Sequence, residues 1–228
     1  MTKTTATAKI RKSTRTKEKI IDSYLHLMLN KKWDKISVKE LCSYAEITRG
    51  TFYQYYDDIY DLMESLETSL LDDLTNRYTN IHQASYAVIP EEHFIDKFDY
   101  APPEMLLTWF EFCKEHHKAI KVLLDRKNGD SYFIQRVKQI LTEYINYMMD
   151  CDGRPKDELR APFVHLFLEM HLLAAQLWIE DDENDFLPID EIVNLLNTTR
   201  VGGSYLSYKR RCDPDFDLKM KIKKRTTN

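Results

Sequence analysis

The residues that most constrain this fold are 37–66, where signals for two short helices and a sharp turn precede a longer helix. Ser37 can cap a helix through its hydroxyl, and Glu40, three residues later, can reach back to the Ser37 amide in a capping box. A narrow apolar stripe follows the cap, formed by Val38, Leu41 and Ala45. This spacing predicts a short helix that packs on a small helical bundle.

A second helix is predicted after Thr48, which is another cap residue. In the segment 49–56, Phe52 and Tyr56 lie four residues apart on one helix face. The more outward positions are Arg49, Thr51, Gln54 and Tyr55. Because Arg reads guanine, Gln reads adenine, and Thr or Tyr holds phosphates or thymine methyls, this surface is typical of a helix that enters a DNA major groove.

The run AEITRGTFYQYY at 45–56, followed by Leu62, resembles the helix-turn-helix of the tetracycline-repressor-like (TetR) family. The family pattern is roughly A-G-V-S-x-G-T-[FL]-Y-x-[HY]-F-x-x-K-x-x-L. The resemblance implies base or phosphate contacts from the second helix and backbone contacts beside the first. The residues carried over by position are Ser37, Lys39, Thr48, Arg49, Thr51, Tyr53, Gln54 and Tyr55.

Two positions depart from the family pattern. Glu46 stands where the turn glycine is usual, which requires either another turn geometry or a side chain at positive φ. Ile59 stands where a lysine usually meets a phosphate, and Asp57 and Asp58 precede it. These departures favour an alternative, a TetR-like adaptor or co-activator that acts by protein contact without its own operator binding.

With only five glycines and seven prolines and no hairpin signals, the composition predicts an all-α protein, and the apolar segments along the chain give it about nine helices. The four cysteines are far apart, which suits free thiols in the cytoplasm. No apolar signal peptide opens the chain, and polar residues interrupt the longest apolar run, at 163–179. That run is therefore interpreted as a buried helix rather than a membrane span.

Charge is distributed unevenly along the chain. Residues 1–56 hold 12 Lys and Arg against 5 Asp and Glu, residues 57–208 hold 13 against 29, and residues 209–228 hold 8 against 3. These segments therefore carry +7, −16 and +5. We interpret them as a DNA-binding domain with its N-terminal tail, a helical regulatory and dimerisation domain, and a basic tail.

Apolar periodicity places the remaining helices. Residues 1–13 are predicted to be disordered in isolation, and a first helix covers 14–30. A long helix then runs from 57 to about 81, and the loop at 82–103 marks the domain boundary. Further helices are predicted at 103–117, 119–124, 131–149, from about Asp157 or Pro162 to Glu180, and from Pro188, with a polar, turn-rich tail from Val201.

The helix at 157–180 is apolar on nearly all sides, so it needs cover on all sides. One face can pack on its own domain, and the rest favours a partner subunit, although a monomer that buries the helix centrally is the alternative. The resemblance implies a four-helix homodimer interface from the last two helices of each subunit. The residues expected there are Phe167, Leu173, Leu177, Trp178, Ile189, Ile192, Val193 and Leu196.

The resemblance also implies an effector pocket in the helical body, where aromatic and Met side chains are frequent. The expected lining is Trp109, Phe112, Tyr144, Phe167, Met170 and His171, although core packing explains each of these residues individually. We find no catalytic motif and no metal-ligand spacing, so neither an enzyme nor a cofactor is predicted. A helical small-molecule carrier or an enzyme using the body cavity is the weaker alternative.

The combined reading is a cytoplasmic, dimeric TetR-like regulator that binds double-stranded DNA. We expect a repressor on a palindromic operator, released by a small-molecule effector that shifts the helix at 57–81.

Overall fold

The computed structural model describes residues 2–82, 102–125, 127–151, 156–180 and 187–212. Within these ranges every regular element is helical, with nine α-helices and one 3₁₀ turn. Their bounds are α1 Thr2–Met28, η1 Trp33–Lys35, α2 Val38–Tyr44, α3 Arg49–Phe52, α4 Ile59–His82, α6 Glu104–Glu115, α7 His117–Leu123, α8 Ser131–Cys151, α9 Arg160–Glu180 and α10 Ile189–Cys212. The predicted all-α fold of about nine helices is confirmed.

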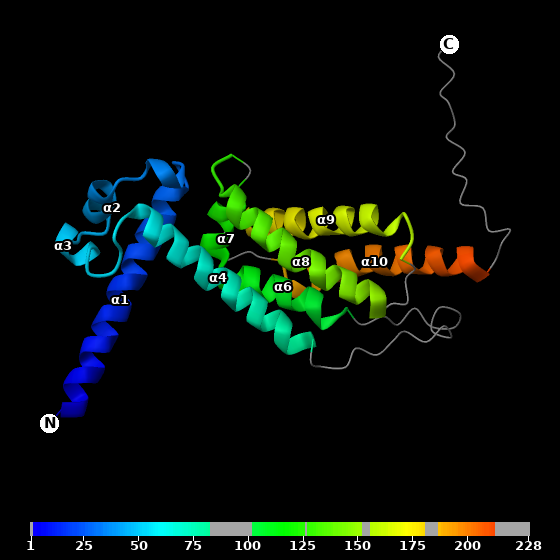
Figure 1. The fold of residues 1–228 in the computed structure, drawn as a ribbon, viewed down its shortest axis with the longest axis horizontal. Helices are drawn as coiled ribbons and strands as arrows, with labels where there is room; N and C mark the ends of the chain where they lie inside the picture. The colour runs from blue at the N-terminus through cyan, green and yellow to red at the C-terminus, as the bar shows by residue number, and fades with distance from the viewer. Residues whose placement is uncertain (1, 83–101, 126, 152–155, 181–186, 213–228) are drawn as a thin grey trace, which may run out of the picture.

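Helices α1, α2 and α3 form a unit at one end of the molecule (Figure 1), and α1 contacts α7 of the body formed by α6 to α10. The predicted capping box begins α2, since the Glu40 amide donates to Ser37 Oγ at 3.2 Å and the Ser37 amide lies 3.5 Å from Glu40 Oε2. Ile20, Leu41 and Phe52 are fully buried between the three helices. Burial of these side chains holds α2 and α3 on α1, because helices this short are not stable alone.

Helix α4 connects the N-terminal unit to the body. An aspartate caps its start, since Asp58 Oδ1 accepts the Asp61 amide at 2.9 Å. The helix then packs against α6 and α8, burying Leu74 and Tyr78 completely or almost completely. Any rotation of α4 within the body would therefore be transmitted to the helix-turn-helix.

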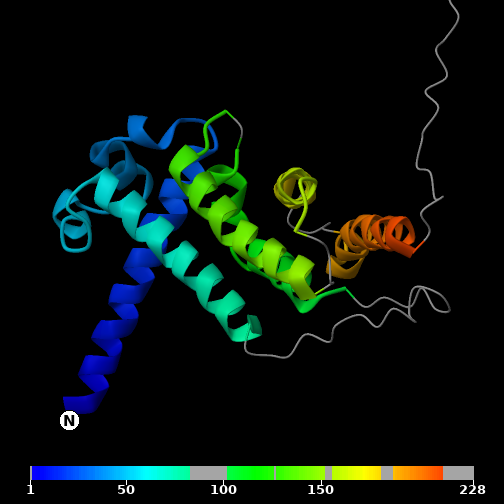
Figure 2. The same ribbon diagram turned by 45° about the vertical axis from the view of Figure 1, so that its right-hand side comes forward.

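The body core is aromatic and is arranged around α6 and α9. In Figure 2, α9 is seen nearly end-on. Helices α4 and α8 lie side by side on one side of it, and α10 lies on the other side. Helix α9 contacts α6, α7, α8 and α10. By length and composition α9 is the one helix in the described residues able to cross a membrane, and 50% of its apolar window is buried inside the fold. This burial fits the predicted core helix.

Two predicted boundaries differ from the structure. Helix α1 begins at Thr2 rather than near Thr14, because no Gly or Pro interrupts 2–28 and an established helix extends at low cost. Helix α10 runs through Gly202 to Cys212, where a polar tail was predicted, and the next proline is Pro214. The predicted loop and domain boundary at 82–103 lie largely outside the described residues.

Candidate DNA-binding surface and cavities

The recognition segment is one α-helical turn followed by a tighter turn. Helix α3 ends at Phe52, although the helical face was predicted to run to Tyr56. The amide of Tyr53 donates to Arg49 O at 2.9 Å, and the amide of Tyr55 donates to Phe52 O at 2.9 Å, three residues back. This tightening turns the chain toward α4 and still buries Tyr56 beside Phe52.

Thr48 caps α3 as predicted. Its Oγ1 accepts the Thr51 amide at 3.1 Å and lies 2.9 Å from the Thr51 hydroxyl. The two threonines therefore stabilise the start of α3 through each other. Thr51 is partly buried as a result, whereas Thr48 is exposed.

The predicted DNA-contacting residues lie on one unit and are mostly exposed. Phe52 and Tyr56 face the core, 0% and 5% exposed. Tyr55 is partly buried, and Lys17 Nζ of α1 lies 5.9 Å from its ring centroid, a contact that the sequence pattern did not predict. The exposed members of the predicted set are Ser37, Lys39, Thr48, Arg49, Tyr53 and Gln54.

Glu46 adopts the left-handed conformation that its position requires, with φ at 49°. The Ile47 amide donates to Cys42 O at 3.0 Å, and the Glu46 amide to Ser43 O at 3.3 Å. This is a Schellman end to α2 with glutamate in the place that favours glycine. The Glu46 side chain is 85% exposed and lies 3.6 Å from Lys19 Nζ, so a negative charge stands beside the turn.

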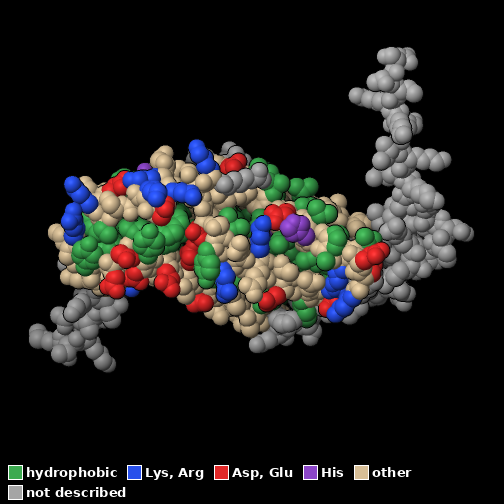
Figure 3. Space-filling view, turned by 45° about the horizontal axis from the view of Figure 1, so that its top comes forward, with side chains coloured by type: hydrophobic (Ala, Val, Ile, Leu, Met, Phe, Trp, Pro, Cys, Tyr) green, Lys and Arg blue, Asp and Glu red, His purple; other side chains and the backbone are tan. Residues whose placement is uncertain are grey.

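Carboxylates accept the backbone amides at the start of α4. The Asp57 amide donates to Asp61 Oδ2 at 2.8 Å, and Ile59 is buried at 6% exposure where the family pattern has lysine. On the face drawn in Figure 3, Lys and Arg side chains follow one edge of the N-terminal end, and acidic side chains gather along the other. A DNA backbone would therefore be attracted to one edge of this unit and repelled from the other.

The six predicted pocket residues lie in the body, and most of them are packed in its core. Trp109 Nε1 donates to His171 O at 3.3 Å, and the His171 ring packs edge-on against Phe167, with centroids 4.5 Å apart. Burial lowers the pKa of His171 to about 4, so its ring is neutral. Phe112 stacks on Trp109, Tyr144 stacks on Tyr78, and Met170 is partly buried.

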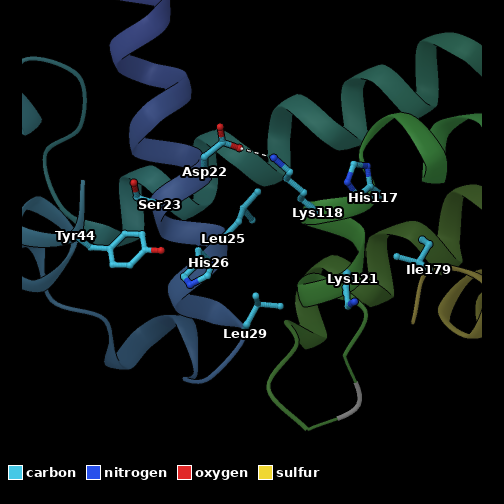
Figure 4. A pocket seen from close by; sticks show the side chains of 10 residues that line it. All are labelled: Asp22, Ser23, Leu25, His26, Leu29, Tyr44, His117, Lys118, Lys121 and Ile179. Carbon is cyan, nitrogen blue, oxygen red and sulfur yellow. Dashed lines mark ion pairs between the residues drawn. The ribbon is translucent and has the colours of Figure 1, made fainter. Parts of the chain in front are cut away.

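None of those six residues lines any of three prominent cavities in the described part of the chain. One of them, about 450 Å³, lies between the N-terminal unit and the body (Figure 4). A second, about 290 Å³, adjoins it and shares Leu29, Lys121 and Ile179. A third, about 380 Å³, lies between α8 and α9 near Arg160.

The predicted dimer residues divide into two groups. Five of them are buried in the chain's own core and are not open to a partner: Phe167, Trp178, Ile192, Val193 and Leu196. Ile189 is partly buried, whereas Leu173 and Leu177 are 40% and 57% exposed. Leu166 and Leu195, which were not in the predicted set, are 65% and 63% exposed. The exposed apolar surface of α9 and α10 is therefore formed partly by residues outside that set. In a helix that is apolar on all sides, sequence periodicity cannot distinguish core leucines from surface leucines.

A polar cluster that the sequence did not predict lies where the N-terminal unit meets the body. Trp33 Nε1 donates to Asp130 Oδ2 at 2.8 Å. Glu67 is only 7% exposed, and desolvation, with the nearby Asp130 carboxylate, raises its pKa to about 8. Among the described residues, the Tyr24 hydroxyl and Glu67 Oε1 are buried without a hydrogen-bond partner. Glu67 lies on the apolar face of α4, and this position was the only sequence signal that could have pointed to the cluster.

No protein-family model and no curated protein matches this sequence. Solved structures do match its fold. The fatty acid degradation regulator FadR from Bacillus halodurans is 16% identical, with a TM-score of 0.55, covering 82% of this chain and 95% of that chain. A TetR-family transcriptional regulator from Syntrophomonas wolfei is 17% identical, with a TM-score of 0.52 over 83% and 96% of the two chains.

A TetR-family regulator from Streptomyces coelicolor is 18% identical, with a TM-score of 0.51 over 88% of this chain and 84% of that chain. The fold is therefore TetR-like over most of its length, with an N-terminal helix-turn-helix and a helical C-terminal body.

Proposed function

We propose that this protein is a cytoplasmic transcriptional regulator that binds a palindromic DNA operator as a homodimer. The observation that carries the proposal is the surface of α3 and its flanking turn. Arg49 and Gln54 are exposed there, while Phe52 anchors the segment from beneath. A rigid, anchored segment that presents base-reading side chains is the arrangement a recognition helix needs.

The homodimer is supported by the leucines on the outer surface of α9 and α10. Leu166, Leu177 and Leu195 are each more than half exposed. Exposed apolar side chains on adjacent helices are stabilised when a second copy covers them. Two subunits joined in this way would place their recognition segments in successive major grooves, about 34 Å apart.

Within this proposal the protein is a repressor rather than an enzyme, and a small molecule bound to the body lowers its operator affinity. Helix α4 supplies the mechanical link, because it begins directly after the recognition segment and packs on α6 and α8. A ligand would act only through a difference in its affinity for the two orientations of α4.

A second function, an adaptor that works by protein contact, is favoured by the charges around α3. The exposed side chains of Glu46, Asp57 and Asp58 surround the segment, and Ile59 is buried where a lysine would meet a phosphate. Each like charge near the DNA backbone lowers electrostatic attraction.

The test is a salt-dependent titration of the purified protein against a pool of genomic fragments, with the bound fragments sequenced. Enrichment of one palindrome, with affinity that falls steeply as salt rises, supports the regulator. Failure to enrich any fragment, together with weak binding at low salt, overturns it and directs the search to protein partners.

A further inference from the structure

The cavity of about 450 Å³ lies at the junction of the two parts of the molecule. One wall is formed by α1 and α2, and the other by α7 and the end of α9. Figure 4 shows Tyr44, His26 and Leu29 on the first wall and Lys118 and Lys121 on the second. Its volume lies in the range of small-molecule sites in proteins.

The first wall is aromatic and apolar. The His26 and Tyr44 rings stack with centroids 5.0 Å apart and an interplanar angle of 16°. Tyr44 and Leu29 are each 48% exposed, and Leu25 is buried beside the cavity. This wall suits a flat, apolar ligand group.

The second wall is cationic. Lys118 and Lys121 line the cavity from α7, and the one carboxylate that lines it, Asp22, lies 3.7 Å from Lys118 Nζ. Lys121 Nζ lies 3.5 Å from Glu180 O, a neutral carbonyl. The carboxylates of Asp125 and Glu180 line the adjoining cavity rather than this one. The formal charges lining the cavity therefore leave one positive charge in excess.

We infer that this junction cavity binds a small aromatic anion, with its ring against the Tyr44 and Leu29 wall and its carboxylate or phosphate toward Lys118 and Lys121. Two lysines in a half-enclosed site attract an anion more strongly than they would in open water. The aromatic wall selects against inorganic anions, which cannot use its apolar surface.

A ligand in this position touches the N-terminal unit and the body together, so it biases the angle between them. This regulatory consequence rests on the proposed function, although ligand binding itself does not. If the ligand changes DNA affinity by some factor, DNA must change ligand affinity by the same factor.

The binding test uses three probes in calorimetric titration: 2-naphthoate, the neutral 2-naphthamide and inorganic phosphate. We expect naphthoate to bind at least about tenfold more tightly than naphthamide, and we expect no detectable binding of phosphate. A parallel titration with 2-naphthyl phosphate distinguishes a phosphate head from a carboxylate. Equal affinity for naphthoate and naphthamide would overturn the inference.

Variants locate the site. In the double variant K118Q/K121Q, naphthoate should bind about tenfold more weakly, while naphthamide affinity changes by less than about twofold. Leu29→Trp, at a half-exposed position, should fill the cavity and weaken both probes. Lys114→Gln on α6 is the matched control, because Lys114 is exposed and lines none of the three cavities. Unchanged naphthoate affinity in K118Q/K121Q, with an unchanged melting temperature, places the binding elsewhere and contradicts the proposal.

Repeating the naphthoate titration with and without an enriched DNA fragment tests the regulatory consequence separately. A change in naphthoate affinity supports coupling, and an identical affinity removes it while leaving the binding site in place. If no fragment is ever enriched, the proposed function fails, yet the probe titrations still decide whether the site exists.

Discussion

Trp33 and Asp130, 97 residues apart in the chain, are joined by a 2.8 Å hydrogen bond from the indole Nε1 to Oδ2. The other carboxylate oxygen of Asp130 accepts the Phe133 amide at 2.9 Å at the start of α8. Asp130 therefore caps a body helix and holds the N-terminal unit at the same time. The body helix and the link to the helix-turn-helix share one carboxylate.

Replacing Trp33 with Phe removes the donor while retaining an aromatic ring beside Tyr60, whose centroid lies 5.3 Å away. We expect the free energy of unfolding to fall by about 1 to 3 kcal/mol, because a hydrogen bond to a charged group is lost. Urea unfolding measures the change. A double-mutant cycle with Asp130→Ala should show strong non-additivity, and purely additive losses would argue against the link.

The buried carboxyl of Glu67 should make the free energy of unfolding depend on pH. Its pKa is raised to about 8 in the folded protein from the usual 4.5, first by burial and then by the charge of Asp130. Between those values the folded state holds a proton that the unfolded chain releases. The stabilising contribution of this group is therefore complete below pH 4.5 and is lost as the pH rises toward 8, with a slope of at most about 1.4 kcal/mol per pH unit.

The variant Glu67→Gln cannot titrate, so its stability relative to the wild type should increase steadily across this pH window. Denaturant unfolding at several pH values measures the difference. Asp72→Asn, at an exposed position on α4 whose charge does not contribute to the raised pKa of Glu67, is the control and should leave the profile unchanged. Parallel profiles for the wild type and Glu67→Gln would show that the carboxyl is already ionised in the folded state.

Glu46→Gly tests the departure at the turn. Glycine adopts φ near 49° without steric cost, so we expect about 1 kcal/mol of added stability. The same change removes a negative charge beside the recognition segment, so DNA affinity at low salt should also rise. Thermal unfolding and DNA titration measure the two effects. Glu46→Gln is the control, because it removes the charge and keeps the strained φ; if it stabilises as much as glycine does, strain is not the cause.

Local signals in the sequence predicted the parts of the fold that depend on neighbouring residues. The Ser37 capping box, the Thr48 cap and the inward position of Phe52 each follow from spacings of three or four residues, and the structure contains all three. The positive φ at Glu46 was also one of the two geometries expected.

Contacts between distant elements were not predictable in this way. The hydrogen bond between Trp33 and Asp130, and the cavity between α1 and α7, depend on how the N-terminal unit lies against the body. Periodicity also could not separate the buried Trp178 from the exposed Leu177, because both lie in a helix that is apolar on every face. Only the packing of neighbouring helices decides which side remains open.

Arg49 and Lys39 should contribute differently to DNA binding if α3 reads bases. Arg49→Ala should cost about 1 to 3 kcal/mol at one operator position and relax the sequence preference there. Lys39→Ala should weaken binding to all sequences and reduce the salt slope by about 1. Competition titrations with single-base operator variants measure both. An equal loss on specific and random DNA for Arg49→Ala would remove its base-reading role.

Leu177→Glu tests the homodimer surface, because Leu177 is 57% exposed on α9. In a subunit alone the new carboxylate would remain in water, so the fold and melting behaviour should change little. In a dimer that buries this position, an unpaired charge would enter an apolar contact at a cost of several kcal/mol, weakening association by about a hundredfold or more. Sedimentation velocity measures the subunit equilibrium.

Tyr132→Glu, at a 60% exposed position on α8, is the matched control and should leave the dimer intact. If both variants remain dimeric, the outer leucines of α9 are not the interface; if the wild type is itself monomeric, palindromic operator binding by a stable homodimer is excluded.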